Sequence, residues 1–148
     1  MYIKIKRLHI DTDTMPTHGS KFSAGWDLKA HIGEPGYVAI DPGEMKSIGT
    51  GIAVSIPVGY FGGLYARSGL ATNKGLRLTT GTSVIDSDYR GEIMVGLYND
   101  SDQTQYVTHG DRIAQLVVQK HEIVDGWEVV SELDPTERGE GGFGSTGK

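Results

Sequence analysis

The chain has 148 residues, enough for one domain with a substantial hydrophobic core but too few for two such domains. It contains no cysteine, which excludes disulfides, thiolate zinc sites and cysteine nucleophiles. The formal net charge of -5 argues against a nonspecific nucleic-acid binder, because such a protein needs a basic surface. An anionic small ligand would instead have to be met by a few placed arginines, by backbone amides or by a bound cation.

The N-terminal residues alternate apolar and basic side chains, with Ile3 and Ile5 next to Lys4 and Lys6. No later window of the sequence approaches the length of a membrane span. We therefore expect no membrane partner and no nucleic-acid partner. The expected location is the cytoplasm, or the interior of the host cell if the source is viral.

Short segments with a period of two residues recur along the chain and predict an all-β fold. Turn-forming residues separate these segments, and no window sustains a helical repeat over three turns. One short helix is expected at residues 68–73, before a stop at Asn73, Lys74 and Gly75. The spacing indicates a jelly-roll-like β-sandwich or distorted barrel, formed by a single domain over residues 1–137 and followed by a tail over 138–148. The expected strands are residues 2–8, 37–40, 51–56, 60–65, 92–98, 113–118 and 127–130.

The last eleven residues are rich in glycine, so we expect a mobile tail that cannot order itself by burying side chains. The tail nevertheless carries a guanidinium (Arg138), an aromatic ring (Phe143) and two hydroxyls (Ser145 and Thr146). Glycines such as Gly144 let backbone amides approach an anion closely. These groups suit a segment that folds over a nucleotide, and the plainer alternative is a flexible terminus with no function.

Charged residues and a tyrosine lie between two apolar segments at residues 84–92. Asp86 follows Val84 and Ile85, so its carboxylate is expected to end a buried strand, to be partly desolvated and to suit the removal of a proton from water. Tyr89 offers a flat apolar face to a sugar or a base. The alternative is an ordinary hairpin tip, since Asp and Gly dominate turns.

Three further segments could contact an anion or a cation. Arg67, Ser68 and Gly69 join a strand to the short helix, where free amides, a hydroxyl and a guanidinium could bind an anion. Asp27 could face a hydrated magnesium ion, or it could simply bond to nearby backbone amides. Gln115 is either an outward-facing strand residue or a positioned hydrogen-bonding group.

Several common motifs are missing. The sequence has no Gly-x-x-x-x-Gly-Lys-Ser/Thr loop and no His-Glu-x-x-His pair, so phosphate-loop and zinc-protease functions lack support. The five histidines are scattered without ligand spacing, and we assign none of them a role.

Taken together, the segments resemble the trimeric dUTPases, the deoxyuridine triphosphate nucleotidohydrolases. The resemblance rests on five motifs in order, of which the third and fifth are long. They are Ala-Gly-Trp-Asp-Leu at 24–28, Ala-Arg-Ser-Gly-Leu-Ala at 66–71, Gly-Thr-Ser-Val-Ile-Asp-Ser-Asp-Tyr-Arg-Gly-Glu at 81–92, Gly-Asp-Arg-Ile-Ala-Gln-Leu at 110–116, and the glycine-rich tail.

The resemblance implies a jelly-roll-like fold, a homotrimer with sites at the subunit junctions, and Mg2+-assisted hydrolysis of dUTP to dUMP and pyrophosphate. Asp86 matches the general base, and Tyr89 matches the tyrosine that packs on deoxyribose. Asp27 matches the acid that is linked to magnesium through water. A hairpin at residues 80–85, together with Met94, matches the pocket that reads uracil; its members are Thr80, Ser83, Val84 and Ile85. The phosphate contacts of the family are matched by Arg67, Ser68, Gly69 and Gln115. In the tail, Phe143 matches the residue that covers the base, and the substrate contacts are matched by Arg138, Gly144, Ser145 and Thr146.

Three positions depart from the family pattern, namely Trp26, Ala66 and Thr80, of which Thr80 bears on how the pocket bonds the base. Two alternative functions remain open. A dCTP deaminase resembles dUTPases in fold and in the Arg-Ser segment, but it needs a different acid and base arrangement at the cytosine ring. A nucleotide-sensing or protein-binding module on the same fold would bind nucleotide without turnover.

Overall fold

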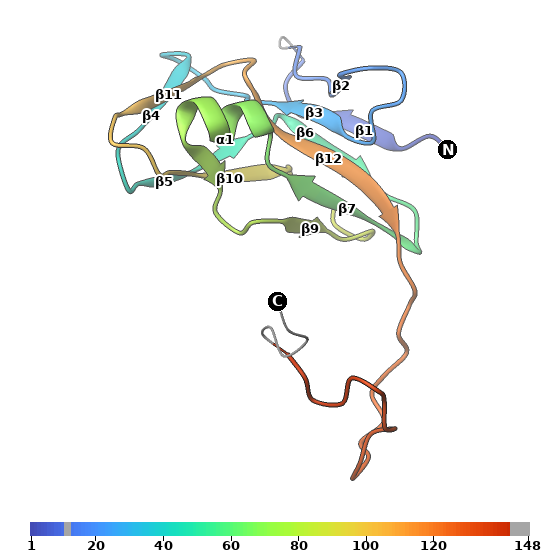
Figure 1. Ribbon diagram of the computed structural model, residues 1–148. Helices are drawn as coiled ribbons and strands as arrows, with labels where there is room; N and C mark the ends of the chain where they lie inside the picture. Colours follow the sequence, from blue (N-terminus) through green and yellow to red (C-terminus); the bar gives the residue numbers. More distant parts are fainter. Residues whose placement is uncertain (11–12, 143–148) are drawn as a thin grey trace.

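The computed structural model describes residues 1–10 and 13–142. Figure 1 shows a body of packed β-strands with one helix against it, from which the chain leads away after the last strand. The expected all-β class is confirmed. Within the described residues the elements are β1 (Lys4–Arg7), β2 (Thr17–His18), β3 (Trp26–Lys29), β4 (Tyr37–Ile40), β5 (Met45–Gly49), β6 (Ile52–Ser55), β7 (Tyr60–Tyr65), α1 (Ser68–Lys74), β8 (Leu76–Leu78), β9 (Ser83–Ile85), β10 (Met94–Asn99), β11 (Gln105–Thr108) and β12 (Arg112–Lys120).

The strands form antiparallel ladders that connect distant parts of the sequence. The largest sheet has the order β2-β3-β12-β7-β9, and a second has the order β5-β10-β8. Two further ladders join β1 to β6 and β4 to β11. The arrangement is a jelly-roll-like β-sandwich, and the described strands do not close into a barrel.

Alternating side chains of the strands meet in one hydrophobic core between the sheets. Leu28 and Leu64 come from the five-stranded sheet, and Val95 and Leu97 from β10 at the centre of the three-stranded sheet. Each of these side chains is almost completely buried, so truncating one to alanine removes apolar contacts and leaves a cavity. A Leu97→Ala change is therefore expected to cost about 2–5 kcal/mol of stability.

The helix α1 is the short helix that the sequence predicts, with the expected stop. Gly75 follows it in the left-handed conformation, at φ 66°, and its N–H donates to the carbonyl of Ala71 at 3.0 Å. Glycine adopts this conformation without a steric cost, which explains why the helix ends there. Across the described residues, we find no helix with the length and apolarity that a bilayer crossing requires.

The chain changes character after Lys120, the last residue of β12. Residues 121–142 contain no helix or strand, and Figure 1 shows this segment leading away from the β body. The expected strand at 127–130 is wrong, since Trp127 is 93% and Val129 97% exposed and neither pairs with a described strand. The last strand of the β body among the described residues is therefore β12.

Candidate active site

The described part of the chain places the expected site residues in two separate groups. The first, which we call the arginine group, contains Asp27, Arg67, Ser68, Gly69 and Gln115 at one end of the five-stranded sheet. The second, the β9 group, lies on β9, on the turns on either side of it and at the start of β10. Its members are Thr80, Ser83, Val84, Ile85, Asp86, Tyr89 and Met94.

The arginine group is built on three adjacent strands. Gln115 on β12 pairs with Asp27 on β3 and with Tyr65 at the end of β7. Residues that pair directly across antiparallel strands point to the same face of the sheet. Two residues beyond Tyr65 the chain reaches Arg67, which precedes Ser68 and the start of α1. The sheet therefore brings three motifs that are far apart in sequence to one place.

Asp27 is the centre of this group. Its side chain is only 8% exposed, and each carboxylate oxygen accepts a hydrogen bond from a different arginine. Arg67 Nε donates to Oδ1 at 2.9 Å, and Arg112 Nη1 donates to Oδ2 at 3.1 Å. Arg67 Nη1 also donates to the backbone carbonyl of Arg112 at 3.2 Å. The backbone-amide bonds considered for Asp27 are thus replaced by two ion pairs, which satisfy the buried charge and leave the cluster with a net positive charge.

Gln115 lies directly over the backbone of Gly25. A Cβ atom at position 25 would fall 2.9 Å from Gln115 Oε1 and 3.1 Å from its Cβ. A larger residue at position 25 would force the Gln115 side chain to shift, so the glycine of the Ala-Gly-Trp-Asp-Leu motif shapes the surroundings of Gln115. This contact limits where the Gln115 side chain can lie, and both interpretations of Gln115 stay predictions.

The β9 group differs from the expected hairpin. Strand β9 pairs with β7, whereas β8, the strand before it, pairs with β10. Residues 79–82 thus cross from one sheet to the other, and residues 80–85 with Met94 are not the arms of one hairpin. The hydroxyls of Thr80 and Ser83 lie 2.7 Å apart, within hydrogen-bond distance, so the departure at Thr80 is used to close this turn.

Asp86 follows β9 on the outer face of the sheet. Ile85 before it is buried against the core, but the Asp86 side chain itself is exposed in the single chain. The partial desolvation expected from its place after a buried strand is therefore not provided by this chain alone. Asp86 lines a small cavity of about 200 Å³ together with Phe61, Val84 and His121.

Tyr89 is held by a short local contact. Its hydroxyl donates to the backbone carbonyl of Glu92 at 2.9 Å, and its ring lies against Gly91. Tyr89 remains 42% exposed, and Met94, the first residue of β10, is 43% exposed. Both side chains therefore present apolar surface that a ligand could cover.

The two groups do not meet within one chain. Gln115 pairs with Tyr65, at the end of β7. Strand β9 runs antiparallel to β7, so Ile85 pairs with Gly62, and Asp86 continues toward the start of β7. At the usual strand geometry, Asp86 and Gln115 are separated by about 13 Å along the strands and about 10 Å across them. A water molecule at Asp86 is therefore out of hydrogen-bond reach of Gln115 in the same chain.

The tail residues are only partly described. Arg138 Nε donates to the carbonyl of Gly141 at 2.8 Å, within the tail itself. No hydrogen bond in residues 1–10 and 13–142 joins Arg138 to either group. Phe143, Gly144, Ser145 and Thr146 lie outside the described residues.

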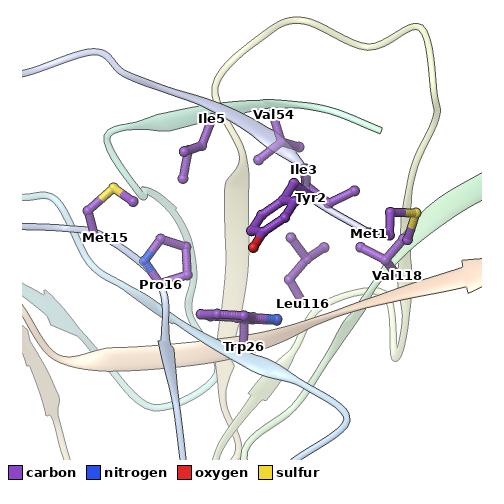
Figure 2. Close-up of a pocket in the computed structure, with 10 residues that line it drawn as sticks. All are labelled: Met1, Tyr2, Ile3, Ile5, Met15, Pro16, Trp26, Val54, Leu116 and Val118. Atoms are coloured by element: carbon purple, nitrogen blue, oxygen red, sulfur yellow. The ribbon is translucent and has the colours of Figure 1, made fainter. Parts of the chain in front are cut away.

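A larger cavity, of about 330 Å³, lies away from both groups. Figure 2 shows Trp26 on one side of it and Ile5 and Val54 on the opposite side. Its lining is mostly apolar, and none of the expected site residues contributes to it. The larger cavity is therefore separate from the predicted site.

Two residues near the site were missed by sequence reasoning. Arg112 belongs to the fourth motif, and its basic side chain at the start of a strand could have been linked to Asp27. His121 follows β12 and lies beside Asp86 in the small cavity, and no sequence signal indicated this position. Its ring meets the ring of Phe61 edge to face, with centroids 6.0 Å apart.

Three of the scattered histidines come together in the fold. His31 stacks on His9 with ring centroids 3.9 Å apart, and His109 meets His31 edge-on at 5.4 Å. Burial lowers the pKa of His31 below its ordinary value of 6.5, the His9 and His109 imidazoles lower it further, and Glu92 opposes this effect. Within the described ranges no group of three or more His, Asp or Glu side chains could hold a metal ion.

Comparison with known proteins gives a consistent picture. The dUTPase family model matches residues 11–147. A deoxyuridine 5'-triphosphate nucleotidohydrolase from Corynebacterium glutamicum is 47% identical over 147 residues, which cover 99% of this chain and 95% of that protein.

Solved structures agree with the sequence matches. A variant of the Staphylococcus bacteriophage 80alpha dUTPase bound to dUpNHpp superposes with a TM-score of 0.86, at 29% identity over 99% of both chains. A variant of the dUTPase from phage phi11 of S. aureus superposes with a TM-score of 0.78, at 25% identity over 91% of this chain and 100% of that one. The latter structure describes the coordination of a structural Mg(II) ion.

Proposed function

This chain belongs to the dUTPase family, and we propose that it cleaves dUTP to dUMP and pyrophosphate by attack of water at the α-phosphorus. The observation that carries the mechanism is the position of Asp86, which lies directly after β9 and lines a small cavity on the outer face of the sheet. The alternative of dCTP deamination finds no support in the family match, which is to dUTPases.

The proposed step needs one base and one leaving group. A carboxylate oxygen of Asp86 accepts a proton from water as the water oxygen bonds to the α-phosphorus. The bond between the α-phosphorus and the oxygen that bridges to the β-phosphorus breaks, and pyrophosphate leaves with the electron pair. The exposure of Asp86 in one chain means that substrate and neighbouring segments must exclude bulk water from it.

The β9 group would bind the nucleoside. Tyr89 would pack on deoxyribose and leave no room for a 2′-hydroxyl, because its ring is fixed by the bond to Glu92. The turn that includes Thr80, Ser83, Val84 and Ile85 would read uracil through backbone groups. Met94 would cover the base from the start of β10.

The arginine group would bind the phosphates. With Arg112 beside this group, two guanidiniums share the Asp27 carboxylate, and the resulting net positive charge offsets the repulsion of a triphosphate by a protein with a net charge of -5. Arg67, Ser68, Gly69 and Gln115 would contact phosphate oxygens. The tail residues Arg138, Phe143, Gly144, Ser145 and Thr146 would close over the bound substrate as a lid.

A magnesium ion can be accommodated next to Asp27, but only at a distance. Both oxygens of this carboxylate already accept hydrogen bonds from arginines, so it suits an ion that it reaches through water and that takes its inner ligands from phosphates. When bound, the ion would neutralise charge on the phosphates and help them to accept the attack. The described residues offer no protein cage for it.

We further propose that the active assembly is a homotrimer whose sites each combine groups from different subunits. The separation of Asp86 from Gln115 within one chain supports this, because hydrolysis needs both groups at one substrate. The exposed apolar residues after β12 also support assembly, since such surface is normally covered. They are Ile123, Val124, Trp127, Val129, Val130 and Leu133.

Pyrophosphate release from dUTP, dTTP, dCTP and UTP, measured side by side, tests the function. We expect turnover of dUTP well above that of the other three, whereas ammonia release from dCTP would point to the deaminase. Asp86→Asn should keep nucleotide binding and lose roughly a thousandfold or more in kcat. Asp88→Asn, which removes the same charge two residues further on, is the matched control and should remain active. Equal activity of the two variants would refute the role of Asp86.

A further inference from the structure

The two ion pairs of Asp27 hold two like charges close together. Without the shared carboxylate, the guanidiniums of Arg67 and Arg112 would repel each other and sample many rotamers. Asp27 is nearly buried, so its position is fixed by β3 and not by its own flexibility. The carboxylate therefore sets where both guanidinium groups can lie.

Arg112 contacts Arg67 in two ways. Its guanidinium shares the Asp27 carboxylate, and its backbone carbonyl accepts a hydrogen bond from Arg67 Nη1. It lies at the first residue of β12, where the pairing with β3 shifts register before Ala114. The carbonyl that accepts from Arg67 therefore belongs to the residue at which this register shift begins.

Arg67 is consequently held at Nε and at one Nη1 hydrogen, which leaves its other N–H donors for an anion. A guanidinium that is already oriented loses less conformational entropy when it binds a phosphate. The Arg112 side chain is 51% exposed, so replacing it opens no cavity in the core. An effect of replacing Arg112 on ligand binding can thus be separated from an effect on the stability of the fold.

We propose that Arg112 is a positioning residue, which holds the Arg67 guanidinium through Asp27 in the orientation that meets the triphosphate. The inference rests on the proposed function of the arginine group as the phosphate site. It assigns Arg112 an action through Arg67 and no independent contact with the substrate.

A double-mutant cycle on the full-length protein tests this, with the nonhydrolysable analogue dUpNHpp as the probe. Arg112→Gln should weaken binding of dUpNHpp roughly tenfold and raise the KM for dUTP in step, with kcat little changed. In an Arg67→Gln background the same change should have a much smaller effect, because the residue it positions is gone and only its own charge is lost. Arg112→Lys should recover part of the loss, since a lysine can also pair with Asp27. Arg7→Gln removes an equal charge from β1 and should leave binding unchanged.

Three results would overturn the proposal. Additive losses in the double variant would show that Arg112 acts on the substrate directly. Unchanged binding in Arg112→Gln would show that it positions nothing. A lower melting temperature with unchanged Kd and KM would show a structural role alone. Failure of the proposed function would give a different result, because the wild-type protein itself would then release no pyrophosphate from dUTP.

Discussion

Tyr89 lies so close over Gly91 that a Cβ atom at position 91 would fall 2.6 Å from the Cζ atom of the tyrosine ring. Gly91→Ala should therefore displace the ring and loosen its proposed contact with deoxyribose. We expect the ratio of kcat/KM for dUTP over UTP to fall by roughly tenfold, mainly through a gain in UTP turnover. Competing hydrolysis of the two nucleotides measures this ratio.

The control for this change is Gly33→Ala, because no atom lies within 4 Å of a Cβ at position 33. It should leave the ratio as it is in the wild type. If Gly91→Ala discriminates between dUTP and UTP as well as Gly33→Ala does, then Tyr89 does not exclude the 2′-hydroxyl.

A second prediction concerns Gly25 and Gln115. Gly25→Ala should push Gln115 away from its place over the backbone, which removes one proposed phosphate contact. The KM for dUTP should rise by about tenfold while the protein stays folded. Gly33→Ala, where the added Cβ has open space around it, serves as the reference. A KM equal to that reference would mean that Gln115 makes no contact that matters.

Local patterns predicted much of the fold. The strands at 37–40 and 60–65 were predicted with the bounds of β4 and β7, and the helix at 68–73 differs from α1 by one residue. Their alternation of apolar side chains and their flanking turns are local signals. The failure at 127–130 has the same origin, since alternation there is not matched by any partner strand among the described residues.

Pairing between distant strands could not be predicted in this way. Strand β9 joins β7 instead of its neighbours in sequence, and β10 joins β5 across about fifty intervening residues, as the ladders show. For the site, motif resemblance identified Asp27, but not that its charge is shared by Arg67 and Arg112. Which arginines reach the Asp27 carboxylate depends on the register of β3 against β12, and this register cannot be read from the composition of either strand.

A third prediction follows from the separation of the two groups. Asp86→Asn and Arg67→Gln should each be inactive alone. When the two are unfolded, mixed and refolded together, roughly a quarter of the sites should combine an intact β9 group with an intact arginine group. Activity of the mixture should rise accordingly.

Mixing Asp86→Asn with Tyr89→Ala provides the control, because both changes damage the β9 group and no intact combination can form. Recovery in this second mixture, or none in the first, would contradict sites shared between subunits. Steady-state pyrophosphate release at equal total protein is sufficient for the comparison.

A fourth prediction is that the histidine cluster makes stability depend on pH. The unfolded chain binds a proton at His31 near pH 6.5, whereas burial and the neighbouring imidazoles lower this pKa in the folded protein. The unfolded state therefore takes up the proton first, and stability falls as pH is lowered from 6.5 through the folded pKa. We expect a falling melting temperature over this range and a flatter profile for His31→Asn.

His18→Asn is the matched variant, since the His18 ring packs at a tilt against Trp26 and lies outside the cluster. It should keep the steeper wild-type profile. Equal slopes for His31→Asn and the wild type would assign the pH dependence to other groups.

A further prediction concerns the effect of truncating the tail. Removing residues 138–148 should change the melting temperature little, because no helix or strand in the described part of the chain includes residues 138–142. Turnover of dUTP should fall by roughly a hundredfold or more, since the proposed lid is lost. A large drop in melting temperature would instead assign the tail a structural role.

Trp127 also offers an optical probe. At 93% exposure its indole is surrounded by water, so its emission should lie at long wavelength in an isolated chain. When another surface covers the segment, the emission should shift to the blue. Because the sequence has only one other tryptophan, a Trp26→Phe background leaves Trp127 as the sole tryptophan, and selective excitation of its indole makes the burial of this segment visible in real time.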